Sequence, residues 1–164
     1  MHPALPVLHT SIFMTGWITI SLGDITGVGP EVTLKALAAE SAKDDFRYLL
    51  IGDIDRTQLL NEGRGLRLPL ESYDRKNASG RFCLHNPLPE SLPLDVAPGS
   101  PAVARAAIAW LTDAAQRCLR LEMDALVTAP LNKESILRSG LPFIGQTEFL
   151  SELAGTNQTA MMLL

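Results

Sequence analysis

Four residues of this 164-residue chain carry polar side chains whose chemistry suits hydrogen bonds or ion pairs: Asp24, Lys133, Gln146 and Thr147. Lys133 follows a proline turn, from which its ammonium group could reach a phosphate or a carboxylate. Gln146 and Thr147 are adjacent, and both an amide and a hydroxyl can donate and accept hydrogen bonds. Lys133 is therefore a candidate for binding an anionic group.

Asp24 lies in a glycine-rich turn, residues 23–29, between a β-rich segment and a helix that begins at Pro30. A turn in this position suits anions, because the free N–H groups of the helix point toward it. The glycine order does not match the dinucleotide-binding fingerprint. The alternative is a tight strand-to-helix turn that needs positive φ angles. Spacing alone favours the tight turn.

Lys133 and Thr147 each have a structural alternative as well. An exposed lysine at the start of a helix is more often simply solvated. Thr147 could cap the helix that follows it, with Glu148 and Glu152 favourable near the helix N-terminus. A capping threonine can still present its hydroxyl to a ligand, so the two interpretations of Thr147 are compatible.

The histidines and cysteines point to no further chemistry. His2, His9 and His85 have neither metal-ligand spacing nor the pattern of a catalytic triad. Cys83 and Cys118 are far apart and match no metal or redox motif. A disulfide between them is not required by the sequence, so a reducing cytoplasm is the expected location.

Composition limits the classes of partner. Hydrophobic residues make up 46% and charged residues 20% of the chain, as in ordinary globular proteins. The net charge is −4 and no basic block occurs, which argues against nucleic acid or an anionic membrane as the partner. The uncharged N-terminus lacks the basic region of a signal peptide, and Pro3, Pro6 and Gly16 interrupt any spanning segment.

Hydrophobic periodicity predicts alternating strands and helices. A buried type of strand is expected over 124–128, and the clearest helix starts at Ser100-Pro101, with serine as its cap, and runs to about Leu121. The other predicted strands are 17–22, 47–51, 160–164 and a short one at 81–84, and the other predicted helices are 30–40, 55–61, 132–139 and 146–153.

Such alternation predicts an α/β fold with a largely parallel sheet and helices on both faces. Ligands bind at the carboxyl ends of the strands in sheets of this kind, where loops 23–29 and 129–133 are expected. The strand predicted over 160–164 has no crossover or partner after it. The chain is therefore expected to stop before its fold is complete.

Three stretches resemble the 4-hydroxythreonine-4-phosphate dehydrogenase (PdxA) family. They are ITISLGDITGVGPEVTLKAL at 18–37, DALVTAPLNKESI at 124–136 and GLPFIGQTEFLSELAG at 140–155. They occur in the family's order and at compatible spacing. The resemblance covers nearly everything from Met14 onward and corresponds to the N-terminal portion of the family.

The resemblance implies a three-layer α/β/α fold like that of isocitrate and isopropylmalate dehydrogenases, truncated before the second domain is complete. Residues 1–13 would be an N-terminal extension or a disordered tail. Residues 14–128 would form the N-terminal segment of the first α/β domain, and 129–164 would begin the second domain, which binds substrate and metal.

The activity implied is the NAD-dependent oxidation and decarboxylation of 4-(phosphooxy)-L-threonine in pyridoxal phosphate (vitamin B6) synthesis, by a cytoplasmic homodimer that uses a divalent metal. Gln146 and Thr147 align with substrate contacts, and Asp24 and Lys133 would line the cleft. The family's metal-binding histidines lie beyond the third stretch, so this chain contains no metal ligand that the resemblance identifies, and its catalytic residues are not assigned.

One departure from the family pattern is Gln146, which stands where the family commonly has a histidine. Glutamine can form hydrogen bonds but does not titrate near neutral pH. This change is compatible with a subfamily variant, with another phosphorylated four-carbon hydroxy acid as substrate, or with relaxed constraint on an inactive copy. Together with the missing metal ligands, it makes a truncated, catalytically inactive fragment the competing hypothesis.

Overall fold

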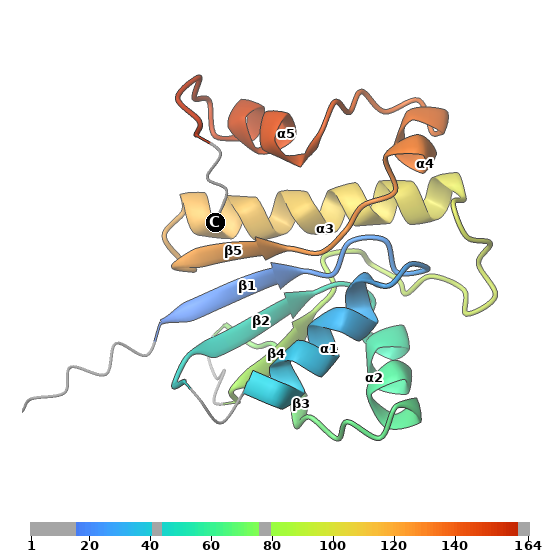
Figure 1. The fold of residues 1–164 in the computed structure, drawn as a ribbon, viewed down its shortest axis with the longest axis vertical. Helices are drawn as coiled ribbons and strands as arrows, with labels where there is room; N and C mark the ends of the chain where they lie inside the picture. The colour runs from blue at the N-terminus through green and yellow to red at the C-terminus, as the bar shows by residue number, and fades with distance from the viewer. Residues whose placement is uncertain (1–15, 41–43, 76–79, 161–164) are drawn as a thin grey trace, which may run out of the picture.

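The computed structural model describes residues 16–40, 44–75 and 80–160, in which five parallel strands form one sheet (Figure 1). The order across the sheet is β3-β4-β2-β1-β5. The strands are β1 (Trp17–Ser21), β2 (Arg47–Ile51), β3 (Leu70–Ser72), β4 (Phe82–His85) and β5 (Ala125–Thr128). Helices cover both faces, so the predicted α/β fold with a parallel sheet is confirmed.

The strand register brings the ends of β1, β2, β4 and β5 to one edge of the sheet. Ser21, the last residue of β1, pairs with Ile51 of β2 and with Thr128 of β5. Ile51 pairs in turn with His85, the last residue of β4. The loops that follow these strands therefore emerge side by side at the carboxyl edge.

One face of the sheet is covered by α1 (Gly29–Glu40) and α2 (Ile54–Gly63). Pro30 occupies the start of α1, where its missing N–H group costs no intrahelical hydrogen bond. Asp53 caps α2, because its side chain accepts a hydrogen bond from the backbone N of Arg56 at 3.1 Å. The apolar cluster beneath these helices includes Ile20, Leu22, Leu34, Leu37, Leu50 and Leu84.

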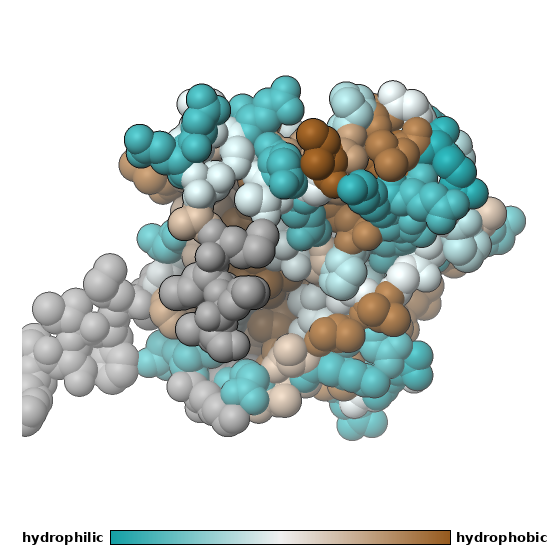
Figure 2. All heavy atoms as spheres, turned by 45° about the horizontal axis from the view of Figure 1, so that its top comes forward, coloured by the Kyte–Doolittle hydropathy of each residue, from teal (hydrophilic) through white to brown (hydrophobic). Residues whose placement is uncertain are grey.

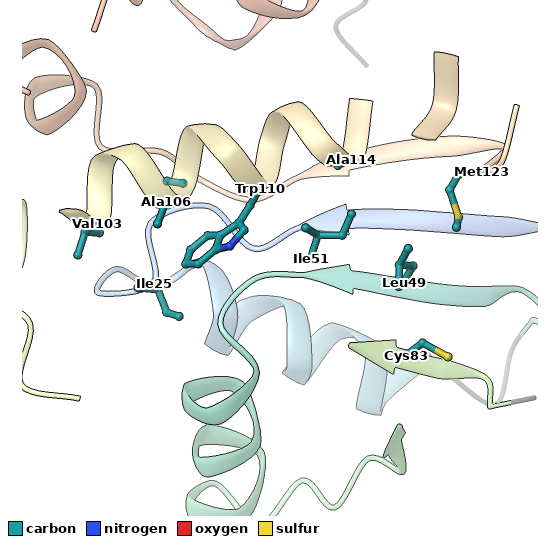
Figure 3. Close-up of a cluster of buried hydrophobic side chains, with 10 residues drawn as sticks. Ile25, Leu49, Ile51, Cys83, Val103, Ala106, Trp110, Ala114 and Met123 are labelled. Atoms are coloured by element: carbon teal, nitrogen blue, oxygen red, sulfur yellow. The ribbon is translucent and has the colours of Figure 1, made fainter. Parts of the chain in front are cut away.

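The opposite face is covered by α3 (Pro101–Leu119), the longest helix of the described chain. Ser100 caps it as predicted, by accepting a hydrogen bond from the backbone N of Val103 at 3.4 Å. Trp110 lies near the centre of the buried cluster between α3 and the sheet (Figure 3). Other members of this cluster are Ile25, Leu49, Ile51, Val103, Ala106, Ala107, Ala114 and Met123.

Two short helices, α4 (Lys133–Arg138) and α5 (Gln146–Leu153), pack on the side of α3 that faces away from the sheet (Figure 1). Ile136 and Phe143 form a third buried cluster with Ala104 of α3. Because α3 lies between the sheet and this layer, it buries residues beyond the single predicted face. A second-domain boundary after Thr128 stays a prediction.

Three expectations about the elements need correction. The structure contains β3, a strand that hydrophobic periodicity did not predict. Helix α3 ends at Leu119 rather than near Leu121, which has a left-handed φ of 58°. Strand β5 is not fully buried, since Ala125 and Val127 are exposed along it, because β5 is the edge strand of the described sheet.

Two predicted segments lie outside the described residues: the N-terminal segment 1–13, and the strand at 160–164 apart from its first residue. Across the described ranges, no helix is long and apolar enough to cross a membrane.

Candidate functional site

The loops after β1 and β5 are joined at the carboxyl edge of the sheet. The backbone N of Ala129 donates to the carbonyl oxygen of Ser21 at 2.9 Å, which continues the strand pairing. One step further, the backbone N of Asp24 donates to the carbonyl oxygen of Pro130 at 3.0 Å. The two loops predicted to form the ligand edge therefore lie in direct contact.

Gly23 makes this contact sterically feasible. Its φ is +68°, in the left-handed region that glycine adopts without penalty. A Cβ atom at this position would lie 2.3 Å from the carbonyl oxygen of Pro130, well inside contact distance. The glycine-rich turn thus serves a close approach between two backbones, as the tight-turn interpretation requires.

Asp24 is nearly buried at the bottom of this turn, with 7% of its surface exposed. Its Oδ1 atom accepts hydrogen bonds from the backbone N of Thr26 at 2.9 Å and from the Thr26 hydroxyl at 2.6 Å. A carboxylate in this place repels an anion. The geometry therefore favours the tight turn over an anion cradle at residues 23–29.

Gln146, the first residue of α5, connects the third motif to the end of β5. Its Nε2 atom donates to the carbonyl oxygen of Ala129 at 3.1 Å, and its Oε1 atom accepts from the Thr128 hydroxyl at 3.0 Å. Gln146 and Thr128 are both half-buried. Residues that are far apart in the sequence thus meet at the carboxyl end of β5.

Thr147 is exposed and does not cap α5. The N-cap residue is Gly145, which provides no side chain for the role, so the capping prediction for Thr147 is wrong. Thr147 instead lies at the second position of α5. There it lines a surface pocket of about 630 Å³ that also includes Glu148, Ser151 and Asn157.

Lys133 is exposed at the first position of α4, directly after the 129–132 segment. The helix is capped by Asn132, whose Oδ1 atom accepts from the backbone N of Ser135 at 3.0 Å. In the described part of the chain, no ion pair involves Lys133. Its side chain is therefore available to a ligand and is equally compatible with simple solvation.

Thr128 belongs to the candidate site and was not predicted, whereas Ala129 lies in the predicted 129–133 loop but was not singled out. Thr128 contributes a hydroxyl, and Ala129 contributes only its backbone carbonyl group. A carbonyl group leaves no trace in residue type, whereas Thr128 ends a strand next to a predicted ligand loop. That position was the available signal.

A shallow groove of about 290 Å³ lies beside these residues, between α1 and β5. Its lining is largely apolar and includes Ile20, Val32, Ala36, Val127, Ala129 and Pro130. The exposure of Val127 is explained by this groove, because α1 does not cover the edge of the sheet.

His85 lies in a different cluster, at the end of β4. Its Nε2 atom is 2.8 Å from Nη2 of Arg117 and 3.7 Å from Oδ2 of Asp113. Arg117 can only donate, so His85 accepts through Nε2 and is neutral in this arrangement. Within the described ranges, no group of three or more His, Cys, Asp or Glu side chains could hold a metal ion.

This environment predicts a pH-dependent stability. Burial, followed by the nearby Arg117 charge, lowers the pKa of His85 below its ordinary value of 6.5, although Asp113 opposes the shift. The folded state therefore binds fewer protons than the unfolded state. We expect the His85 contribution to be fully present above pH 6.5 and to be lost as the pH falls toward the folded-state pKa.

Urea unfolding at a series of pH values measures this effect, with His85→Gln as the comparison. The decline between neutral and mildly acidic pH should be smaller in the variant, because glutamine does not titrate. Equal slopes in the two proteins over this range would contradict the assignment to His85.

Comparison with known proteins relates this arrangement to a family. Residues 46–164 match the model of the pyridoxal phosphate biosynthetic protein PdxA. A D-threonate 4-phosphate dehydrogenase of Cupriavidus necator is 37% identical, and the match covers 90% of this chain and 45% of that protein. A 4-hydroxythreonine-4-phosphate dehydrogenase of Geobacter metallireducens is 36% identical over 89% of this chain and 44% of that protein.

A solved structure gives the same result. The crystal structure of a 4-hydroxythreonine-4-phosphate dehydrogenase from Burkholderia phymatum has a TM-score of 0.77 and 32% identity, and the match covers 91% of this chain and 46% of that one. The chain thus spans a little under half the length of these relatives. With a family model matched over most of its residues and a shared fold, the chain belongs to the PdxA family.

Proposed function

We propose that this chain forms the N-terminal portion of an NAD-dependent dehydrogenase that acts on a phosphorylated four-carbon hydroxy acid. The reaction proposed first is the oxidation and decarboxylation of 4-(phosphooxy)-L-threonine in pyridoxal phosphate synthesis. The supporting observation is that the 23–29 loop, the 128–133 segment and Gln146 meet at the carboxyl edge of a parallel sheet. This is where α/β enzymes bind their ligands.

The substrate has a specific competitor. One relative, 37% identical, is named a D-threonate 4-phosphate dehydrogenase, and others are named 4-hydroxythreonine-4-phosphate dehydrogenases. The two compounds share a four-carbon chain, a carboxylate, a phosphate and an oxidisable secondary hydroxyl group. Gln146 is the reason to consider D-threonate 4-phosphate as the substrate, since an amide in place of the usual histidine would change the group that faces the substrate.

The residues of this chain would bind and orient the substrate. The amide of Gln146 and the hydroxyl of Thr147 offer donors and acceptors for the substrate's polar groups, and Lys133 offers a positive charge for its phosphate or carboxylate. Asp24 would hold the shape of the cleft through its bonds to Thr26.

In the proposed oxidation, the carbinol C–H bond breaks with its electron pair and the O–H proton is released. NAD supplies the hydride acceptor when it is bound. The β-keto acid that results then loses carbon dioxide. The described residues do not fit a metal site, so no step is assigned to a metal in this part of the chain.

The proposed setting is a cytoplasmic homodimer. Cys83 and Cys118 are both free, which agrees with a reducing compartment. Figure 2 shows apolar side chains in separate patches on the surface near the layer that contains α4 and α5. Leu137 is 50% exposed and Ile144 is 73% exposed in this layer. Exposed apolar patches of this kind often mark an interface with another chain or domain.

The competing proposal is a catalytically inactive fragment, and one assay separates the two. The purified 164-residue chain is mixed with NAD, a divalent cation and either 4-(phosphooxy)-L-threonine or D-threonate 4-phosphate. NADH absorbance reports turnover, and titration calorimetry reports binding. Turnover of one compound supports the enzyme and identifies its substrate. Binding without turnover supports a substrate-binding portion. The absence of both turnover and binding supports the inactive fragment.

Replacing Gln146 by histidine tests whether this residue faces the substrate. A histidine there would titrate near pH 6.5, whereas the amide does not. We expect the ratio of the variant Kd to the wild-type Kd to change with pH between about 5.5 and 7.5. This ratio cancels the titration of the substrate phosphate, which occurs in the same range.

Gln116→His is the matched control, because Gln116 is exposed on α3. Its Kd ratio should stay constant with pH. A constant ratio for Gln146→His as well would place residue 146 outside the binding site.

A further inference from the structure

We propose that Thr128 is a positioning residue that fixes the side-chain amide of Gln146 in one orientation at the substrate cleft. This inference deepens the proposed function, because it concerns how the same site recognises an oxygen atom of the phosphorylated hydroxy acid. Neither residue type nor family resemblance assigned a role to Thr128. The role follows from two hydrogen bonds that hold opposite ends of one amide.

The orientation of the amide follows from chemistry. The carbonyl oxygen of Ala129 can only accept a hydrogen bond, so the Gln146 atom 3.1 Å from it must be Nε2. The other end, Oε1, can only accept, so the Thr128 hydroxyl 3.0 Å away must donate its proton. The Ala129 carbonyl group therefore selects one of the two amide orientations, and the Thr128 hydroxyl holds the Oε1 end in that orientation by donating to it.

The groups that hold Gln146 are themselves part of the sheet edge. Thr128 pairs with Ser21 at the end of β5, and the backbone N of Ala129 donates to Ser21. The last residue of β5 and the residue that follows it therefore supply both partners of the amide. The position of Gln146 is set by the strand rather than by α5 alone.

Two hydrogen-bonding capacities of the amide remain after these contacts: one N–H group and one lone pair of Oε1. Because the amide cannot rotate without losing a partner, the free donor stays on the Ala129 side and the free acceptor on the Thr128 side. A hydroxyl oxygen can use both groups at once, and a carboxylate oxygen can use only the donor. The fixed amide thus suits recognition of a substrate hydroxyl.

The first test observes the amide itself by NMR spectroscopy of the ¹⁵N-labelled 164-residue chain, without any ligand. Loss of a side-chain signal in Gln146→Ala assigns the Gln146 NH₂ group. In Thr128→Val, which keeps the shape of the side chain but removes the hydroxyl, we expect these two proton signals to shift and to exchange faster. In Thr128→Ser, which retains the hydroxyl, they should stay near their wild-type positions. Unchanged Gln146 signals in Thr128→Val would overturn the proposal.

The second test asks whether the positioning matters for binding. The Kd for 4-(phosphooxy)-L-threonine and for D-threonate 4-phosphate is measured with the wild-type chain, Thr128→Val, Thr128→Ser, Gln146→Ala and the double variant. Loss of one hydrogen bond predicts that Thr128→Val weakens binding about three- to tenfold, with Thr128→Ser close to wild type. In the Gln146→Ala background, Thr128→Val should have no further effect.

The outcomes separate the positioning role of Thr128 from the proposed function of the chain. If the loss caused by Thr128→Val persists in the Gln146→Ala background, Thr128 acts independently of Gln146 and the positioning role is wrong. If the wild-type chain binds neither compound, the proposed function of this chain is contradicted, while the NMR result still decides whether Thr128 orients Gln146.

Discussion

Gly23→Ala is expected to lower the free energy of unfolding by about 3–5 kcal/mol, since a left-handed φ costs an ordinary residue about 1–2 kcal/mol and a backbone clash adds to it. The new Cβ would lie 2.3 Å from the carbonyl oxygen of Pro130 and 2.9 Å from that of Ala129. Both are backbone atoms, so they cannot rotate away. Relief requires the two loops to separate, which breaks the hydrogen bond from Asp24 to Pro130.

Gly65→Ala is the matched control. Gly65 has nearly the same φ, +66°, but no atom lies within 4 Å of the position that its Cβ would occupy. This substitution should cost only the conformational part, about 1–2 kcal/mol. Urea unfolding followed by far-UV circular dichroism measures both variants. Equal losses in the two would show that the approach of the loops at Pro130 is not tight.

The effect of Gly23→Ala should extend to the candidate site. Ala129, which flanks Pro130, is the backbone partner of Gln146. Displacement of this segment therefore changes the support of the amide, and substrate binding should weaken even at temperatures where the variant stays folded. Gly65→Ala should leave binding unchanged, because Gly65 lies in the turn after α2, away from this edge.

Local signals predicted most of the fold because they act within a few residues. Ser100 followed by Pro101 marks the start of α3, and the structure shows that cap. Strand β3 left no such signal, since Glu71 and Ser72 are exposed and only Leu70 is half-buried. Its pairing with β4 is a long-range contact that sequence periodicity does not register.

The candidate site, like the fold, was predictable only where its residues stand in local motifs. Asp24 and Gln146 were identified because they stand in recognisable motifs, and the structure places both at the carboxyl edge. The contacts made by the carbonyl groups of Ala129 and Pro130 were not predictable, because every residue type possesses a carbonyl group. Two traces were visible in the sequence: the missing side chain of Gly23, which those carbonyl groups require, and the position of Thr128 at the end of a strand.

Strand β5 illustrates a different limit. Its sequence, ALVT, favours a strand buried on both faces, yet Val127 is 49% exposed. Composition reports how much apolar surface a strand has but not which neighbour covers it. The described sheet ends at β5, so the groove beside α1 stays open there.

Trp110→Ala is expected to lower the free energy of unfolding by about 3–5 kcal/mol, the usual cost of removing a large aromatic side chain from a core. Trp110 is fully buried between α3 and the sheet, at 0% exposure (Figure 3). Its indole Nε1 also donates to Oδ1 of Asn86 at 3.0 Å. The substitution therefore leaves a cavity in the cluster and removes a hydrogen bond.

Two further variants separate these contributions. Trp110→Phe keeps most of the apolar volume but loses the indole donor, so it should cost less than Trp110→Ala by about 2 kcal/mol or more. Leu119→Ala removes a side chain that is 52% exposed at the end of the same helix and should cost about 1 kcal/mol or less. Circular dichroism is a better probe of unfolding than tryptophan fluorescence, because the chain has two tryptophans and each Trp110 variant removes one of them.

The order of the three losses tests how α3 is attached to the sheet. If packing at Trp110 dominates, the loss is largest for Trp110→Ala, smaller for Trp110→Phe and smallest for Leu119→Ala. If Trp110→Phe were as costly as Trp110→Ala, the hydrogen bond to Asn86 would carry most of the energy instead. That result would make the loop after β4, rather than the apolar cluster, the main attachment of α3 and of the α4–α5 layer that packs on it.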